Sequence, residues 1–162
     1  MIFRGFLIGF GFLLTVTCVS AKNYAFPVKN PVGTIVLPDH WKITSIDRGL
    51  EAKSSHDDVY FSIENANNKN IDKIMKEMVE WLKENKIEIT KEGDEIERDF
   101  GGLSGFIMKN EAKDENGPTT ITWIVVKKDG VGAIMTFWAS EEEMAAHKDE
   151  VNKIVASIKA IQ

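Results

Sequence analysis

Cysteine and histidine are scarce in this sequence. Its 162 residues include one cysteine, Cys18, and three histidines, His40, His56 and His147. One cysteine cannot close a disulfide within the chain, so a hydrophobic core must stabilise the fold. No two histidines are spaced i, i+4, so the zinc-binding H-E-x-x-H motif is absent. We therefore predict no metal site and no cofactor.

The sequence also lacks the usual motifs of catalysis and nucleotide binding. Neither G-x-x-x-x-G-K-[ST] nor G-x-G-x-x-G occurs after the N-terminal segment. Gly102 to Gly105, G-L-S-G, lacks the G-x-S-x-G spacing of a nucleophile elbow. We predict no catalytic residues and no enzyme.

Long apolar runs are confined to the N-terminus. Arg4 precedes an apolar run from Gly5 to Val16, and small or polar residues follow as far as Ala21, which is the order of a secretory signal. The run is about a dozen residues long, whereas a membrane-spanning helix needs roughly 20. We therefore predict a signal peptide over residues 1–21, cut between Ala21 and Lys22, and an exported protein that is periplasmic or secreted.

Two alternatives to simple cleavage stay open. The segment could remain as an uncleaved anchor, or Cys18 could be lipidated after processing. Lipidation requires a very small residue before the cysteine, and Thr17 stands there instead. Cleavage after Ala21 would remove the only cysteine.

Acidic residues outnumber basic ones. The 25 Asp and Glu against 20 Lys and Arg give a formal net charge of −5. The predicted signal carries one of the basic residues and none of the acidic ones, so the remaining domain of about 140 residues stays acidic. An acidic surface repels the phosphate backbone, so we do not expect a nucleic acid partner.

After the signal, the spacing of apolar residues is typical of strands in some segments and of a helix in others. Residues 22–32 contain Pro27 and Pro31 and are predicted to be an extended arm or edge strand, leaving one domain over residues 33–162. The range 71–86 has apolar residues at spacings of three and four, which predicts an amphipathic helix packed on the core. Strands are predicted near residues 34–43 (two), 50–54, 59–64, 87–91, 95–100, 103–113, 119–128 and 131–139.

The Asp129-Gly130 pair predicts a tight hairpin in which Lys128 pairs with Val131. Directly opposite residues share a face, and in that register both faces of the hairpin are largely apolar, with Trp123 and Trp138 together on one of them. A strand pair with one face in water would alternate, so we expect a central hairpin covered on both sides. Ser140 and Glu143 form a capping-box sequence, which predicts one closing helix that lies on the sheet and runs to the chain end.

Two polar clusters and one tryptophan stand out as candidate sites. The sequence S-S-H-D-D over residues 54–58 is interpreted as a polar turn, with a metal or acid–base site as the alternative. Glu95, Glu97 and Asp99 share one strand face, with Phe106 and Met108 expected opposite them across the Gly101-Gly102 turn. They are interpreted as a solvated edge, with a calcium site or a docking face for a basic partner as alternatives. Trp81 lies beside the apolar stripe of its helix, so we expect partial exposure and possible partner contact there.

The order of elements resembles that of the PsbP-like and Mog-like superfamily. The resemblance includes L-P-D-H-W at Leu37 to Trp41, G-G-L-S-G-F near residue 103 and a closing segment that contains Ser157. Within the superfamily, the sequence is most similar to the small exported bacterial proteins of the DcrB-like kind, whose function is uncharacterised. The resemblance implies an α+β fold in which helices cover an antiparallel sheet, an α/β/α sandwich. PsbP assists a photosynthetic assembly and Mog-type proteins bind a small GTPase, but no motif for either partner is present in this chain.

Three functional classes follow, in this order. The first is a non-enzymatic, exported accessory or interaction protein of the bacterial cell envelope, with a protein partner of unknown identity. The second is a binding module for a small apolar or cationic ligand held between sheet and helix, and the third is an enzyme. A cleft with converging polar groups favours the ligand, whereas an exposed apolar patch around Trp81 favours a protein partner.

Overall fold

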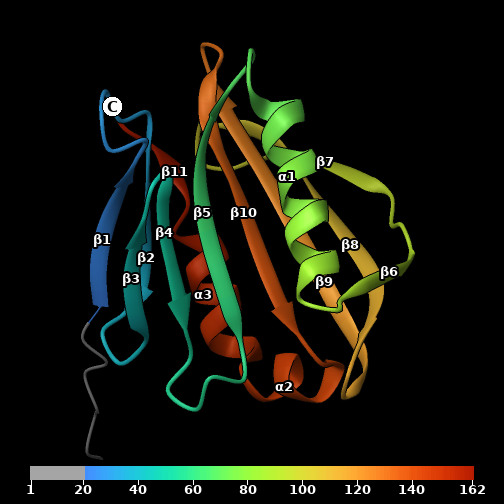
Figure 1. Ribbon diagram of the computed structural model, residues 1–162. Helices are drawn as coiled ribbons and strands as arrows, with labels where there is room; N and C mark the ends of the chain where they lie inside the picture. Colours follow the sequence, from blue (N-terminus) through green and yellow to red (C-terminus); the bar gives the residue numbers. More distant parts are fainter. Residues whose placement is uncertain (1–20) are drawn as a thin grey trace, which may run out of the picture.

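The computed structural model describes residues 21–162, so Cys18 and nearly all of the predicted signal lie outside the described residues. The described chain contains eleven strands and three helices, and all strand pairs are antiparallel. The α+β fold predicted from the sequence is confirmed (Figure 1). No helix within residues 21–162 is long and apolar enough to cross a bilayer.

The main sheet has eight strands in the order β3-β4-β5-β10-β9-β8-β6, and β7 also pairs with β8. The strands alternate apolar and polar side chains or are apolar on both faces, which is why they form a covered sheet. Their bounds are β3 Lys42–Ile46, β4 Gly49–Lys53, β5 Tyr60–Asn67, β6 Glu88–Lys91, β7 Glu95–Asp99, β8 Ser104–Asp114, β9 Gly117–Lys128 and β10 Val131–Ala139.

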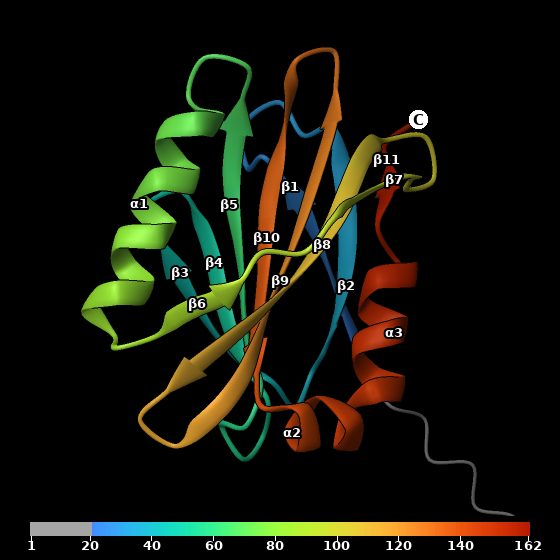
Figure 2. The same ribbon diagram turned by 90° about the vertical axis from the view of Figure 1, so that its right-hand side faces the viewer.

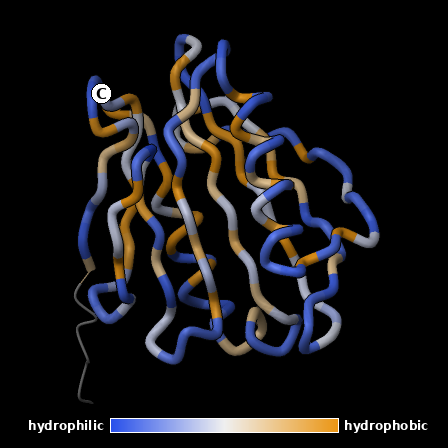
Figure 3. The backbone as a smooth tube through the Cα atoms, in the orientation of Figure 1, coloured by the Kyte–Doolittle hydropathy of each residue, from blue (hydrophilic) through white to orange (hydrophobic). Residues whose placement is uncertain are grey.

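The predicted central hairpin is confirmed residue by residue. Lys128 pairs with Val131 across the turn, and both turn residues have positive φ, 53° at Asp129 and 78° at Gly130. The pairing continues to Thr120 opposite Ala139. Both faces of the hairpin are buried, and Figure 3 shows apolar residues along these central strands.

Helix α1 (Ile71–Glu84) covers one face of the main sheet. It buries Ile74, Met78 and Leu82 in a cluster that includes Ile121 and Trp123 of β9. The spacing of four between the buried helix residues places them on one side, so the predicted core-facing stripe is confirmed. Figure 2 shows α1 and α3 on opposite sides of the sheet.

The other face is covered by a small sheet together with a helix, whereas the sequence predicted a helix alone. The small sheet has the order β1-β2-β11, with β1 at Ala21–Phe26, β2 at Gly33–Pro38 and β11 at Lys159–Ala160. Ile35 and Leu37 of β2 are fully buried against the main sheet. The segment expected to be an arm or edge strand thus contains β1, which pairs along all of β2.

The prediction of one helix running to the chain end was wrong. The segment forms α2 (Glu141–Ala146) and α3 (Lys148–Ala156), which meet at His147, and then becomes β11. The helix ends at Ser157, whose hydroxyl accepts a hydrogen bond from the Val36 amide at 2.8 Å and donates one to the Ile154 carbonyl at 2.6 Å. Ser157 therefore continues the edge pairing of β2 where β11 does not reach, and it diverts the chain from helix to strand.

Candidate functional site

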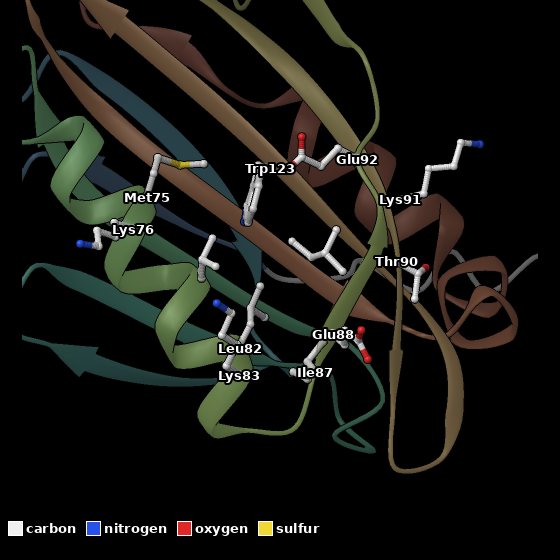
Figure 4. Close-up of a pocket in the computed structure, with 12 residues that line it drawn as sticks. Met75, Lys76, Leu82, Lys83, Ile87, Glu88, Thr90, Lys91, Glu92 and Trp123 are labelled. Carbon is white, nitrogen blue, oxygen red and sulfur yellow. The ribbon is translucent and has the colours of Figure 1, made fainter.

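A hollow opens between α1 and β6, and we call it the α1–β6 hollow (Figure 4). Its volume is about 520 Å³, within the range of roughly 300–1,000 Å³ that small-molecule pockets occupy. Helix α1 forms one wall, β6 the opposite wall, and β9 the base. The lining residues are Met75, Lys76, Val79, Leu82, Lys83, Ile87, Glu88, Ile89, Thr90, Lys91, Glu92 and Trp123.

Trp123 gives the base of this hollow a polar atom. The residue is only 5% exposed, and its indole nitrogen is buried without a hydrogen-bond partner. Figure 4 shows the ring between α1 and β6, with the nitrogen at the end that faces the middle of the hollow. A buried donor without an acceptor costs about 1–3 kcal/mol. Less than 1 Å² of this nitrogen is accessible, so a ligand acceptor would relieve that cost only after the side chains around the ring shift.

The charges around the opening are divided between paired and unpaired groups. On β6, Glu88 pairs with Lys113 at 2.8 Å and Lys91 pairs with Glu111 at 2.9 Å. On α1, neither Lys76 nor Lys83 forms a salt bridge with any residue in the range 21–162. In Figure 4 the Lys76 ammonium points away from the hollow, whereas Lys83 lies beside Leu82 at the rim. Lys83 is thus the cation placed to meet an anionic group at the opening.

A second hollow lies on the other side of α1, towards β4 and β5, and has a volume of about 340 Å³. It shares Leu82 and Trp123 with the first. Here Arg48 bridges Glu64 at 2.7 Å and Glu77 at 2.8 Å. Hydrogen bonding to Glu64, together with the charges of both carboxylates, raises the pKa of Arg48 against the opposing effect of its partial burial. Because Arg48 is already paired with two carboxylates, it is not free to bind a ligand, and this hollow is a weaker ligand site than the first.

Trp81 lies at the edge of this second hollow and is 36% exposed, as the sequence predicted. Its ring stacks on Tyr60 with centroids 5.4 Å apart and meets Trp138 edge-on at 6.5 Å. Burial, together with the charges of Glu51 and Glu64, raises the pKa of Tyr60 to about 12, although hydrogen bonding with Ser62 opposes the shift. Tyr60 is therefore a neutral, stacked aromatic at physiological pH.

The histidines His40 and His147 meet at Glu150 of α3. His40 Nε2 lies 3.0 Å from one carboxylate oxygen, and the other oxygen accepts from Trp41 Nε1 at 3.0 Å and lies 3.3 Å from His147 Nδ1. His147 Nε2 lies 3.3 Å from Asp58. These contacts fasten α3 to two turns of the sheet. Neither this cluster nor any other group of His, Cys, Asp or Glu side chains within residues 21–162 is arranged so that it could hold a metal ion.

The other predicted clusters have simpler surroundings. The segment 54–58 forms the turn between β4 and β5, in which the buried Ser54 hydroxyl accepts hydrogen bonds from the amides of Asp58 and Val59. Glu95 lies opposite Met108 and Glu97 opposite Phe106, as predicted, and all of β7 is exposed. Ala21 and Lys22, the predicted cleavage residues, begin β1.

Sequence reasoning placed Trp123 in the core but missed the α1–β6 hollow. The signal within the sequence is weak: Lys76 and Lys83 lie seven positions apart on α1, beside the apolar stripe. Whether that side of α1 is open depends on the distance between α1 and β6, and the local sequence pattern does not indicate that distance.

The fold is similar to that of several solved structures. CyanoP, the PsbP of the cyanobacterium Synechocystis, has a TM-score of 0.65 at 10% identity, and the match covers 93% of this chain and 98% of that one. LpqN of Mycobacterium tuberculosis has a TM-score of 0.56 at 14% identity, with 88% and 92% covered. A Bacteroides thetaiotaomicron protein has a TM-score of 0.56 at 13% identity, with 87% and 48% covered.

No protein-family model matches the sequence, and no curated protein matches it significantly. At identities of 10% to 14% the structural similarity establishes the fold alone. The PsbP-like fold expected from the sequence is confirmed, and function must be argued from the site.

Proposed function

We propose that this protein is a non-catalytic accessory protein of the bacterial cell envelope, exported by its N-terminal signal, that binds a small amphiphile in the α1–β6 hollow. The observation that carries the proposal is the buried, unpartnered indole N–H of Trp123 at the base of a hollow with apolar walls and a charged rim that includes Lys83 and Glu92. Structural similarity to LpqN, which is described as involved in cell envelope biogenesis, agrees with this setting.

The chemistry of the hollow defines the ligand class. An apolar chain would lie against Val79, Leu82 and Ile87, and each buried methylene group would contribute about 0.8 kcal/mol. A carbonyl or ether oxygen on the chain would accept from Trp123 Nε1. An anionic head would remain at the opening beside Lys83. A fatty-acid-like molecule with an ester or ether oxygen in its chain combines these three features and so fits this arrangement.

Binding of a dansylated fatty acid to the purified protein, followed by fluorescence, tests the proposal. Trp123→Phe keeps an aromatic ring but removes the N–H, and we expect it to weaken binding about tenfold. Trp138→Phe is the matched control, because the Trp138 indole nitrogen is also buried without a partner but lies outside the hollow. Equal effects of the two substitutions, or no binding by the unaltered protein, would exclude the α1–β6 hollow as the ligand site.

A second pair of variants tests the rim. Lys83→Gln should weaken a probe with an anionic head more than a neutral ester of the same chain, whereas Lys76→Gln should affect neither. Both residues are exposed on α1, so the two substitutions are similar in their effect on folding. Extraction of the protein from its native envelope, followed by mass spectrometry, would then identify the natural ligand.

A protein partner at Trp81 is the second candidate. The supporting observation is a large aromatic side chain, 36% exposed, above the Tyr60 and Trp138 rings. Exposed tryptophans supply much of the energy at protein interfaces. Crosslinking in the native envelope should recover a partner with the unaltered protein and lose it with Trp81→Ala; equal recovery with both would rule out this contact.

A further inference from the structure

Strand β7 has a free edge. It pairs only with β8 among the described residues, and Figure 1 shows it at the outer margin of the sheet. All five of its residues are exposed. A strand paired on one side only presents amide and carbonyl groups that can pair with another chain.

The side chains of β7 are divided between its two faces. Glu95, Glu97 and Asp99 lie on the face of α1, because their opposite residues on β8 point towards that side. Ile96, 66% exposed, lies on the other face opposite Ile107. Arg98 is also on that face, and its guanidinium lies 5.6 Å from the centroid of the Phe100 ring.

A hollow of about 510 Å³ accompanies the acidic face of this edge. It is lined by Glu95, Glu97, Asp99 and Arg98 of β7 together with Phe106 of β8 and Lys127 of β9. Three acidic residues against two basic ones leave the hollow with a small net negative charge.

A second copy of this chain does not suit the edge. If two β7 strands paired antiparallel about their centres, Glu97 would face Glu97 and Glu95 would face Asp99 of the other copy. Like charges directly opposite in a sheet are destabilising. The same carboxylates would instead attract an extended segment with lysine or arginine at every second position.

We propose that β7 is a docking edge for an extended basic segment of a partner protein, which adds to the sheet as a further strand. Backbone hydrogen bonds to β7 supply the pairing, as in other cases of strand addition. Basic side chains of the segment meet Glu95, Glu97 and Asp99, and an apolar side chain between them covers Ile96. The edge therefore selects its occupant by charge, independently of any ligand in the α1–β6 hollow.

The test uses labelled peptides and the purified protein. A peptide with the core Lys-Val-Lys-Val-Lys should bind, as measured by fluorescence anisotropy, and should slow hydrogen exchange of the β7 amides. The same peptide N-methylated at alternate amides keeps its charge but cannot pair, and we expect it to bind about tenfold more weakly. A peptide with glutamate at the lysine positions should not bind.

Protein variants separate this edge from general electrostatic attraction. Glu97→Lys should weaken the basic peptide about tenfold, whereas Glu80→Lys, the same charge change on the exposed side of α1, should have little effect. Equal binding of the methylated peptide, or equal loss with Glu80→Lys, would overturn strand addition. If no basic peptide binds, or if the protein dimerises through β7, the carboxylates only protect the edge and the proposal is wrong.

Discussion

At the scale of single residues, Glu150 organises the contacts between α3 and the turns of the sheet. Burial alone would lower the pKa of His147, but hydrogen bonds with Asp58 and Glu150 and the charges of both carboxylates raise it overall. Burial would likewise raise the pKa of Glu150, but hydrogen bonds from Trp41 and His147 and the charge of His40 lower it overall. Each shift favours the charged form, so the cluster stabilises the fold when both partners are ionised.

The directions of these shifts predict a pH dependence. The contribution of His147 is complete below its ordinary pKa of 6.5 and is lost as pH rises through the raised pKa of the folded state. The contribution of Glu150 to stability is complete above its ordinary pKa of 4.5 and is lost as pH falls through the lowered pKa of the folded state. The free energy of unfolding lost in His147→Gln should therefore be largest at pH values between these two ordinary pKa values, and it should become smaller at alkaline pH.

Urea unfolding at a series of pH values measures this difference. The control is His56→Gln, which removes an exposed histidine in the turn between β4 and β5. A loss in His147→Gln that is constant with pH would mean that the imidazole acts only by packing.

Prediction from sequence was accurate for residues whose surroundings are set by nearby chain. The opposed pairs on β7 and β8 follow from the short turn between them, and Trp81 is exposed because it lies beside the apolar stripe of its own helix. The α1–β6 hollow was not predictable, because it depends on the distance between elements. The orphaned indole nitrogen of Trp123 was equally invisible, since it depends on every side chain packed around the ring.

At the scale of elements, the capping box of α2 is an independent source of stability. The Ser140 hydroxyl accepts from the Glu143 amide at 3.2 Å, and the Glu143 carboxylate accepts from the Ser140 amide at 2.8 Å. Helix α2 has six residues and buries none of them fully, and Met144 is its one apolar residue that packs partly buried against the core. Its start should therefore depend on the cap.

Ser140→Ala should lower the free energy of unfolding by about 1 kcal/mol, as loss of a helix cap usually does. Ser140→Thr keeps a hydroxyl acceptor and should restore most of that stability. Thermal and urea unfolding of the two variants measure the difference. A similar loss in both variants would show that the size of the side chain, rather than its hydrogen bond, matters at this position.

The closing segment shows why one element was mispredicted. Apolar residues continue at helical spacing through Ile158 and Ile161, so the local pattern favours a helix to the end. The structure ends the helix because β2 offers an edge to the chain, and Ser157 and Val36, which join the two, are separated by 121 positions. A contact between such distant residues leaves no local trace, whereas the hairpin at Asp129-Gly130 is specified by its own turn.

At the scale of the whole molecule, the two proposed sites occupy different parts of the main sheet. The α1–β6 hollow lies between α1 and β6. The β7 edge lies at the outer margin of the sheet (Figure 1). The histidine cluster and the small sheet lie on the opposite face with α3. One face thus carries the proposed binding functions, and the other carries the contacts that hold the layers together.

The position of β1 bears on the predicted cleavage after Ala21. Ala21 is exposed at the outer end of β1, whereas Phe26 at the inner end is only 2% exposed. A cut after Ala21 would leave Lys22 to Phe26 paired with β2, so the folded domain would keep its edge strand. We therefore predict that the protein recovered from its native envelope begins at Lys22 and retains the full fold.

Intact mass of the recovered protein measures this start directly. A mass that corresponds to a chain starting at Lys22 supports cleavage by a signal peptidase and a mature chain with no cysteine. A mass that corresponds to an acylated chain starting at Cys18 would contradict the predicted cleavage, and the acyl chains would tether the domain to a membrane. A mass that corresponds to a chain starting at Met1 would also contradict it, because the apolar segment would then remain as an anchor. Of the three starts, only the one at Lys22 leaves the domain without an anchor in the membrane.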